Sequence, residues 1–179
     1  MIILTGASGG IGKELVTHLI AIDEVVGIYH SSLPTSIDKR LRYEKVNLEY
    51  PDEIASFAKK WGPVATQLTV IHAAVDKKDN LVVNYKEADW DRAMSINLKA
   101  NYLLSQSLLP FMIKKKWGRI IHISSLGGTE GRPGTIAYST SKAGLVGISN
   151  VLAQEYARFN VTSNILMLGH FDTGLFHAL

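Results

Sequence analysis

Residues 1–12 constrain the fold of this chain more than any other segment. An apolar run at 1–4 is followed by a glycine-rich stretch at 5–12, TGASGGIG, and then by apolar residues at the spacing of one helical stripe. A strand, a glycine-rich turn and a helix in this order predict the first unit of a dinucleotide-binding fold. The helix N-terminus would point its free N–H groups at a pyrophosphate. A glycine-rich loop without a ligand is the alternative.

The glycine spacing gives each glycine a separate role in this interpretation. Gly6 can supply the tight turn, Gly10 can let the main chain approach the pyrophosphate, and Gly12 can let the helix pack closely on the strand. Ser8 and Ile11, within the same turn, are candidate cofactor contacts as well. The sequence therefore predicts a phosphate-binding turn between the first strand and the first helix.

Apolar runs and helical patterns alternate along the rest of the chain. Strands are predicted at 1–4, 25–29, 43–46, 68–72, 119–124 and 161–168, and helices at 11–22, 52–61, 89–116 and 136–159, with a shorter uncertain helix at 36–41. Alternating β and α units indicate an α/β protein with a parallel sheet covered by helices on both faces. We predict one domain, 1–179, with a doubly wound sheet (Rossmann fold) in the strand order 3-2-1-4-5-6.

A second constellation lies in the C-terminal half of the chain. Tyr138 and Lys142 are four residues apart in a predicted helix, and Ser125 follows a predicted strand. A free tyrosine has a pKa of about 10, and a lysine one helical turn later can favour its phenolate through its positive charge. A serine beside them could polarise a carbonyl oxygen by hydrogen bonding. The three side chains together could reduce a carbonyl group, whereas a Tyr-x-x-x-Lys pair alone is a weak signal.

Together these motifs resemble the classical short-chain dehydrogenase/reductase family, and in particular its 3-oxoacyl-carrier-protein reductases. The glycine motif of that family corresponds to residues 5–12, its catalytic serine to Ser125 and its Tyr-x-x-x-Lys pair to Tyr138 and Lys142. Its structural asparagine looks like Asn97. The resemblance implies an oxidoreductase that interconverts a ketone and a secondary alcohol with a nicotinamide cofactor.

The resemblance also implies a role for each of these side chains. Tyr138 would act as the acid or base, Ser125 would steady the substrate oxygen, and Lys142 would hold the nicotinamide ribose. Asn97 would hold a water that links Lys142 to solvent. The alternative for Asn97 is a polar residue on a solvated helix face.

The residues after the second predicted strand bear on the choice of cofactor. An acidic residue there would bind the ribose 2′-hydroxyl of NAD and repel a 2′-phosphate. The sequence at 29–32 is Tyr-His-Ser-Ser and contains no acid, so Ser31 and Ser32 could bind a phosphate and His30 could carry part of a positive charge. The lack of an arginine there, and Gly9 where NADP-dependent relatives often carry a basic residue, argue against this. We predict NADP(H) in preference to NAD(H).

Some segments depart from the family pattern. The usual Asn-Asn-Ala-Gly after the fourth strand is replaced at 72–75 by His-Ala-Ala-Val, and we expect His72 to be a core histidine satisfied by the backbone. Asn47 replaces a common aspartate near the adenine, and the usual proline before Gly169 is a leucine. The resemblance still assigns cofactor contacts to residues in these segments, namely Asn47, Leu48, Ala73, Ala74, Gly169 and Thr173.

The end of the chain is the largest departure. The family continues beyond this point through a substrate-binding lid and a seventh strand, and residues 171–179 look like the beginning of that lid. We therefore expect the lid and the seventh strand to be absent, in a fragment or in a minimal variant, and we expect weak, poorly selective reduction of ketones. In this family the helices predicted at 89–116 and 136–159 commonly form a subunit interface, so the resemblance implies a homo-oligomer, a dimer or a tetramer.

Composition limits the remaining possibilities. The chain has no cysteine, a net charge of +3 and six histidines without metal-ligand spacing. No signal peptide is visible, and no apolar run approaches the ~18 residues that span a membrane. We expect a cytoplasmic enzyme that acts on a small-molecule carbonyl or alcohol, without a metal, membrane or nucleic-acid partner. A dinucleotide-binding sensor or scaffold with little turnover is the alternative.

Overall fold

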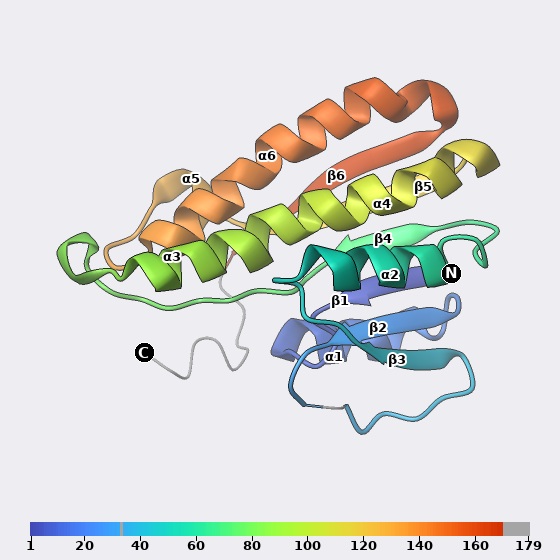
Figure 1. The fold of residues 1–179 in the computed structure, drawn as a ribbon, viewed down its shortest axis with the longest axis horizontal. Coiled ribbons are helices and arrows are strands. Elements are labelled where there is room, and N and C mark those ends of the chain that lie inside the picture. The colour runs from blue at the N-terminus through green and yellow to red at the C-terminus, as the bar shows by residue number, and fades with distance from the viewer. Residues whose placement is uncertain (33, 170–179) are drawn as a thin grey trace.

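The core of the molecule is a parallel β-sheet. The computed structural model describes residues 1–32 and 34–169, in which six strands pair in the order β3-β2-β1-β4-β5-β6 (Figure 1). In chain order they are β1 Ile2–Thr5, β2 Val25–Tyr29, β3 Leu41–Lys45, β4 Thr69–His72, β5 Gly118–Ser125 and β6 Val161–Leu168. The predicted doubly wound sheet and its strand order are therefore confirmed.

The helices occupy the predicted connections between strands. The longer ones are α1 Gly10–Leu19, α2 Pro51–Trp61, α4 Ala100–Lys115 and α6 Ile136–Tyr156, and the shorter ones are η1 Val82–Asn84, α3 Glu87–Met94, α5 Gly127–Glu130 and η3 Ala157–Phe159. In the part of the chain that the structure describes, none of them is long and apolar enough to cross a membrane.

The short helix predicted at 36–41 is wrong. Residues 34–38 are irregular, and the Asp38 carboxylate accepts a hydrogen bond from the Arg40 N–H at 2.7 Å. An aspartate that binds the main chain two residues later favours a turn over a helix. This turn leads directly into β3.

The single long helix predicted at 89–116 is interrupted by a wider turn. Between α3 and α4, residues Ser95–Lys99 form a π-helical segment, η2. Such segments are rare and are frequently found at functional sites. Asn97 lies at the centre of this one.

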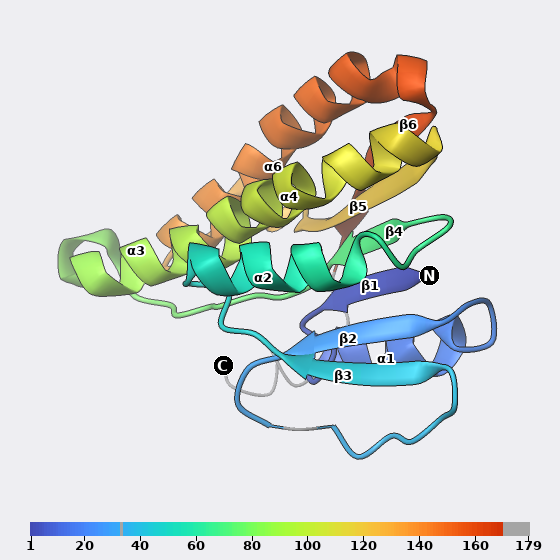
Figure 2. The same ribbon diagram turned by 45° about the vertical axis from the view of Figure 1, so that its right-hand side comes forward.

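Helices cover both faces of the sheet. α2, α4 and α6 lie on one face and α1 lies on the other (Figures 1 and 2). Alternate strand residues point to opposite faces, so Ile3 and Val26 pack in one buried cluster with α2 and α4, whereas Leu4 and Val25 pack in another with α1. Burial on both faces explains why these strands are nearly continuous apolar runs.

The strands end together at one edge of the sheet. Thr5, the last residue of β1, is in register with Ile28 of β2 and His72 of β4, and His72 is in register with His122 of β5. In a doubly wound sheet, ligands bind outside the carboxyl ends of the strands, where the strand order reverses. Here this point lies between β1 and β4.

Candidate active site

Main-chain atoms lie so close together in the glycine-rich turn that two of its positions require glycine. Gly6 has a φ of +70°, and a Cβ there would lie 2.7 Å from the Cα of Ala74. A Cβ on Gly12 would lie 2.0 Å from the carbonyl oxygen of Gly6. The expected tight turn at Gly6 and the close packing at Gly12 are therefore present in the geometry.

The side chain of Thr5 ties this turn to the end of β4. Its hydroxyl oxygen accepts hydrogen bonds from the N–H groups of Ala73 and Ala74, each at 3.0 Å. Ala74 is also the residue that approaches Gly6 most closely. This role could not be predicted from the sequence, because a threonine at the end of a strand is common.

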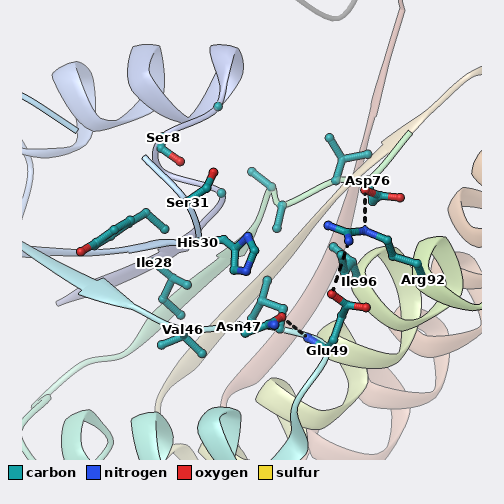
Figure 3. Close-up of a pocket in the computed structure, with 17 residues that line it drawn as sticks. Ser8, Ile28, His30, Ser31, Val46, Asn47, Glu49, Asp76, Arg92 and Ile96 are labelled. Carbon is teal, nitrogen blue, oxygen red and sulfur yellow. Dashed lines mark hydrogen bonds and ion pairs between the residues drawn. The ribbon is translucent and has the colours of Figure 1, made fainter. Parts of the chain in front are cut away.

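A pocket of about 240 Å³ opens beside this turn (Figure 3). It is lined by half of the predicted cofactor contacts, namely Gly6, Ser8, His30, Ser31, Asn47, Leu48, Ala73 and Ala74. The other predicted contacts among the described residues do not line it, namely Gly10, Ile11, Gly12, Ser32, Tyr138, Lys142 and Gly169, and Thr173 lies outside the described residues. Thus the structure brings together residues from the ends of β1, β2, β3 and β4.

The wall opposite His30 contains a cluster of charged side chains that the sequence did not suggest. The guanidinium of Arg92 lies 3.1 Å from the Asp76 carboxylate and 3.8 Å from the Glu49 carboxylate (Figure 3). Arg92 belongs to α3, whereas the two acids follow β4 and β3. Because the side chain of Arg92 is about half exposed, each ion pair contributes little to stability, ~0–1 kcal/mol.

Tyr138 and Lys142 lie in the first two turns of α6, as predicted. Lys142 is buried, and its Nζ donates a hydrogen bond to the carbonyl of Ile123 at 2.6 Å. The same Nζ lies 5.8 Å from the centre of the Tyr138 ring. Burial lowers the pKa of Lys142 from 10.5 to about 8, because the ammonium has lost much of its hydration. The lysine is therefore poised to change charge close to neutral pH.

Ser125 is the last residue of β5 and lies close to Tyr138. Its Oγ accepts a hydrogen bond from the N–H of Gly127 at 3.1 Å. A Cβ on Gly127 would lie 3.4 Å from this Oγ and 3.6 Å from Cε1 of Tyr138. The hydroxyl and the tyrosine ring thus border the same small space, which the absence of a side chain on Gly127 keeps open.

Asn97 is fully buried, which excludes a solvated helix face. Its side-chain oxygen accepts from the N–H of Asp76 at 2.7 Å, and its Nδ2 donates to the carbonyl of Asp76 at 2.8 Å. Nδ2 also lies 3.2 Å from Oγ of Ser141, which in turn donates to the carbonyl of Tyr138 at 2.7 Å. The side chain of Asn97 therefore joins the loop after β4 to the helix that carries Tyr138.

His72 is a core residue, as expected, but its Nε2 is bound by a side chain. This atom lies 2.9 Å from Oγ of Ser105, where we had expected a backbone partner. Its ring stacks on that of His122, with the ring centres 4.9 Å apart. Burial lowers the pKa of His72 well below its usual value, and His122 and Lys142 lower it further. In the described residues, no group of three or more side chains could hold a metal ion.

Comparisons with known proteins agree with this geometry. The family model described as "short chain dehydrogenase" matches residues 1–179. "Nodulation protein G" of Rhizobium sp. (strain N33) is 33% identical over 97% of this chain and 74% of its own length. "3-oxoacyl-[acyl-carrier-protein] reductase FabG" of Rickettsia prowazekii (strain Madrid E) is 34% identical over 97% of this chain and 73% of its own length.

A solved structure shares the fold. A "short chain dehydrogenase/reductase family protein" superposes with a TM-score of 0.89 at 22% identity, covering 98% of this chain and 76% of the other. The strand order, the glycine turn and these sequence matches lead to one conclusion. The chain belongs to the short-chain dehydrogenase family.

Proposed function

We propose that this chain is an NADP(H)-dependent oxidoreductase that interconverts a ketone and a secondary alcohol. The observation that carries the proposal is the meeting of Ser125, Tyr138 and Lys142 at the carboxyl edge of β5 and the start of α6. Members of this family are typically NAD(P)-dependent oxidoreductases. Because relatives are named 3-oxoacyl-carrier-protein reductases, a 3-oxoacyl thioester is the first substrate to test.

The residues of the pocket fit a dinucleotide. Its apolar side chains, Ile28, Val46 and Ile96, would hold the adenine ring, and its polar side chains, His30 and Ser31, would hold the ribose. The glycine turn ends at the N-terminus of α1, whose free N–H groups suit the pyrophosphate.

Three side chains of this chain would carry out the chemistry. When bound, the reduced nicotinamide supplies a hydride to the carbonyl carbon. The electron pair of the carbonyl π bond moves onto the oxygen, and the Tyr138 hydroxyl gives that oxygen its proton. Ser125 donates a hydrogen bond to the same oxygen, and the Lys142 ammonium stabilises the tyrosinate left behind. Loss of the proton from Lys142 would remove this stabilisation.

The preference for NADP(H) rests on the end of β2. His30 and Ser31 line the pocket, are exposed, and are not accompanied by a carboxylate at 29–32. A neutral or cationic wall accepts a ribose 2′-phosphate, whereas an acid there would repel it. The Glu49 and Asp76 carboxylates lie on the opposite wall, where Arg92 partly neutralises them.

We also propose that the chain forms a homo-oligomer through α4 and α6. Several large apolar side chains on these helices are exposed: Tyr102, Val146 and Val151. A hollow on this part of the molecule is lined by Met94, Ser95, Leu98, Lys99, Tyr102 and Ile148. Light scattering of the purified chain tests this, and a monomer at micromolar concentration would refute it.

The substitution Tyr138→Phe tests the proposed activity. It removes the proton donor and leaves the ring, so carbonyl reduction should be lost while the cofactor dissociation constant stays within about twofold. Retention of more than about 5% of wild-type turnover would refute the role of Tyr138. Tight cofactor binding by the wild-type chain without turnover of any carbonyl would instead favour the sensor alternative.

A further inference from the structure

A stacked pair of buried histidines lies under the proposed site. His72 ends β4, His122 lies opposite it on β5, and the two ring planes are inclined by only 6°. Both side chains are almost completely buried. Neither takes part in the chemistry proposed above, although His122 is one residue from Ile123, whose carbonyl receives the Lys142 ammonium.

The hydrogen bonds around His122 determine which ring nitrogen carries the hydrogen when the ring is neutral. Nδ1 of His122 lies 3.2 Å from Oδ1 of Asn101, and Nδ2 of Asn101 donates to the main-chain carbonyl of Asn97 at 3.0 Å. A carbonyl oxygen can only accept, so Asn101 must turn its N–H₂ group toward Asn97 and its oxygen toward His122. That oxygen can only accept as well. His122 must therefore carry a hydrogen on Nδ1. Its Nε2 is a buried acceptor that has no hydrogen-bond partner among the described residues.

This chain of bonds ends at the π-helical segment that holds Asn97. Asn101 binds the main-chain carbonyl of Asn97. The side-chain amide of Asn97 in turn donates a hydrogen bond to the Asp76 carbonyl and contacts Ser141 on α6. The Asn101 side chain therefore adds a hydrogen bond to a main-chain carbonyl of this π turn.

We propose that His122 is a positioning residue of the reduction site, because its Nδ1–H orients Asn101 and Asn101 holds the π turn at Asn97. The proposal rests on the proposed function for its effect on turnover. It assigns His122 no contact with substrate or cofactor. The path runs from β5 through α4 to α6, so it connects the strand that ends in Ser125 with the helix that carries Tyr138 and Lys142.

The surroundings of His122 keep its ring neutral. The titratable groups near it are His72, stacked on its ring, and Lys142, whose positive charge opposes a second cation in the interior. Burial and Lys142 together lower the pKa of His122 to about 4. The Nδ1–H donor is present in the neutral tautomer and in the protonated ring alike, so the bond to Asn101 persists throughout the neutral range.

Two substitutions at His122 separate positioning from packing. In His122→Asn, the amide supplies a donor at the location of Nδ1 but leaves a cavity, whereas His122→Phe keeps the stacked ring and removes the donor. If His122 positions Asn97, kcat should stay within about threefold in His122→Asn and fall about tenfold or more in His122→Phe, with the cofactor KM nearly unchanged in both. If His122 only fills the core, His122→Phe should be the more active of the two, and this order would overturn the proposal.

His72 provides the matched control, since its ring forms its hydrogen bond with Ser105, whereas that of His122 forms its bond with Asn101. The pair His72→Asn and His72→Phe should show no advantage of asparagine over phenylalanine in kcat. Thermal unfolding of all four variants establishes that each is folded under the assay conditions.

Nitrogen-15 NMR of the histidine rings in the wild-type chain tests the bond network without any need for turnover. We expect His122 as the neutral Nδ1–H tautomer, unchanged between about pH 5.5 and 8. An Nε2–H tautomer within that range would overturn the proposal even if the enzyme is active. If the tautomer is as expected but the wild-type chain reduces no carbonyl, the proposed function fails, and with it the role of His122 in turnover.

Discussion

The substitution Lys142→Met should make the protein more stable at neutral pH while it removes the proposed activity. The folded state holds this ammonium in the interior, and the fall of its pKa from 10.5 to about 8 corresponds to about 3 kcal/mol of unfavourable free energy. Methionine has a similar length without the charge. It also loses the hydrogen bond to the Ile123 carbonyl, which costs about 1–2 kcal/mol. The variant should therefore gain about 1–2 kcal/mol in the free energy of unfolding at pH 7.

The sign of the pH dependence makes this prediction specific. Above about pH 8 the folded state has released the proton of Lys142, but the unfolded state keeps it until about pH 10.5. Because the unfolded state then binds more protons, the Lys142 contribution to stability rises with pH over this interval. Below about pH 8 both states are protonated and the contribution is constant. By about pH 9.5 the wild-type chain should recover about 2 kcal/mol relative to Lys142→Met.

Denaturant unfolding of both proteins at about pH 7 and 9.5 measures this difference. Lys59→Met is the control, since Lys59 is exposed on α2. It should change the free energy of unfolding by no more than about 0.5 kcal/mol at either pH. A Lys142→Met variant that is less stable than wild type at pH 7, or whose difference from wild type does not depend on pH, would refute the reasoning.

Three further predictions concern the same edge of the sheet. Carbonyl reduction should decline as pH rises through about 8, because the Lys142 ammonium is lost there; a pH–rate profile that is flat to about pH 9.5 would contradict this. Thr5→Val removes the acceptor of two main-chain N–H groups and should lower the free energy of unfolding by about 2–4 kcal/mol, whereas Thr5→Ser keeps the acceptor and should cost less than half as much in the same unfolding experiment. Ser31→Asp should shift cofactor preference toward NADH by repulsion of the 2′-phosphate, and calorimetric titration with NADPH and NADH would show no shift if Ser31 does not face that group.

The fold could be predicted because the sequence patterns that indicate it are local. The glycine turn, the apolar strands and the helical stripes each depend on neighbouring residues, and the order of the units then determines the sheet. The predicted helix at 36–41 was wrong because the Asp38 carboxylate accepts a hydrogen bond from the main chain and forms a turn. The spacing of apolar residues cannot predict such a hydrogen bond.

The candidate site was predictable in part. Ser125, Tyr138 and Lys142 do come together, since each lies near an element end at the same edge. The partners of Asn97 and His72 were not predictable, because they come from segments far away in the sequence. The ion pairs of Arg92 were missed for the same reason.

Transfer of a labelled hydride tests the central claim most directly. The chain is incubated with a ketone panel that includes a 3-oxoacyl thioester, together with NADPH that carries deuterium at both hydrogen positions of the nicotinamide C4. Mass spectrometry then compares the alcohol with that made from unlabelled cofactor. We predict an alcohol heavier by about one mass unit, formed by the wild-type chain and not by Tyr138→Phe. Binding of the cofactor without any labelled alcohol from the panel would contradict the account.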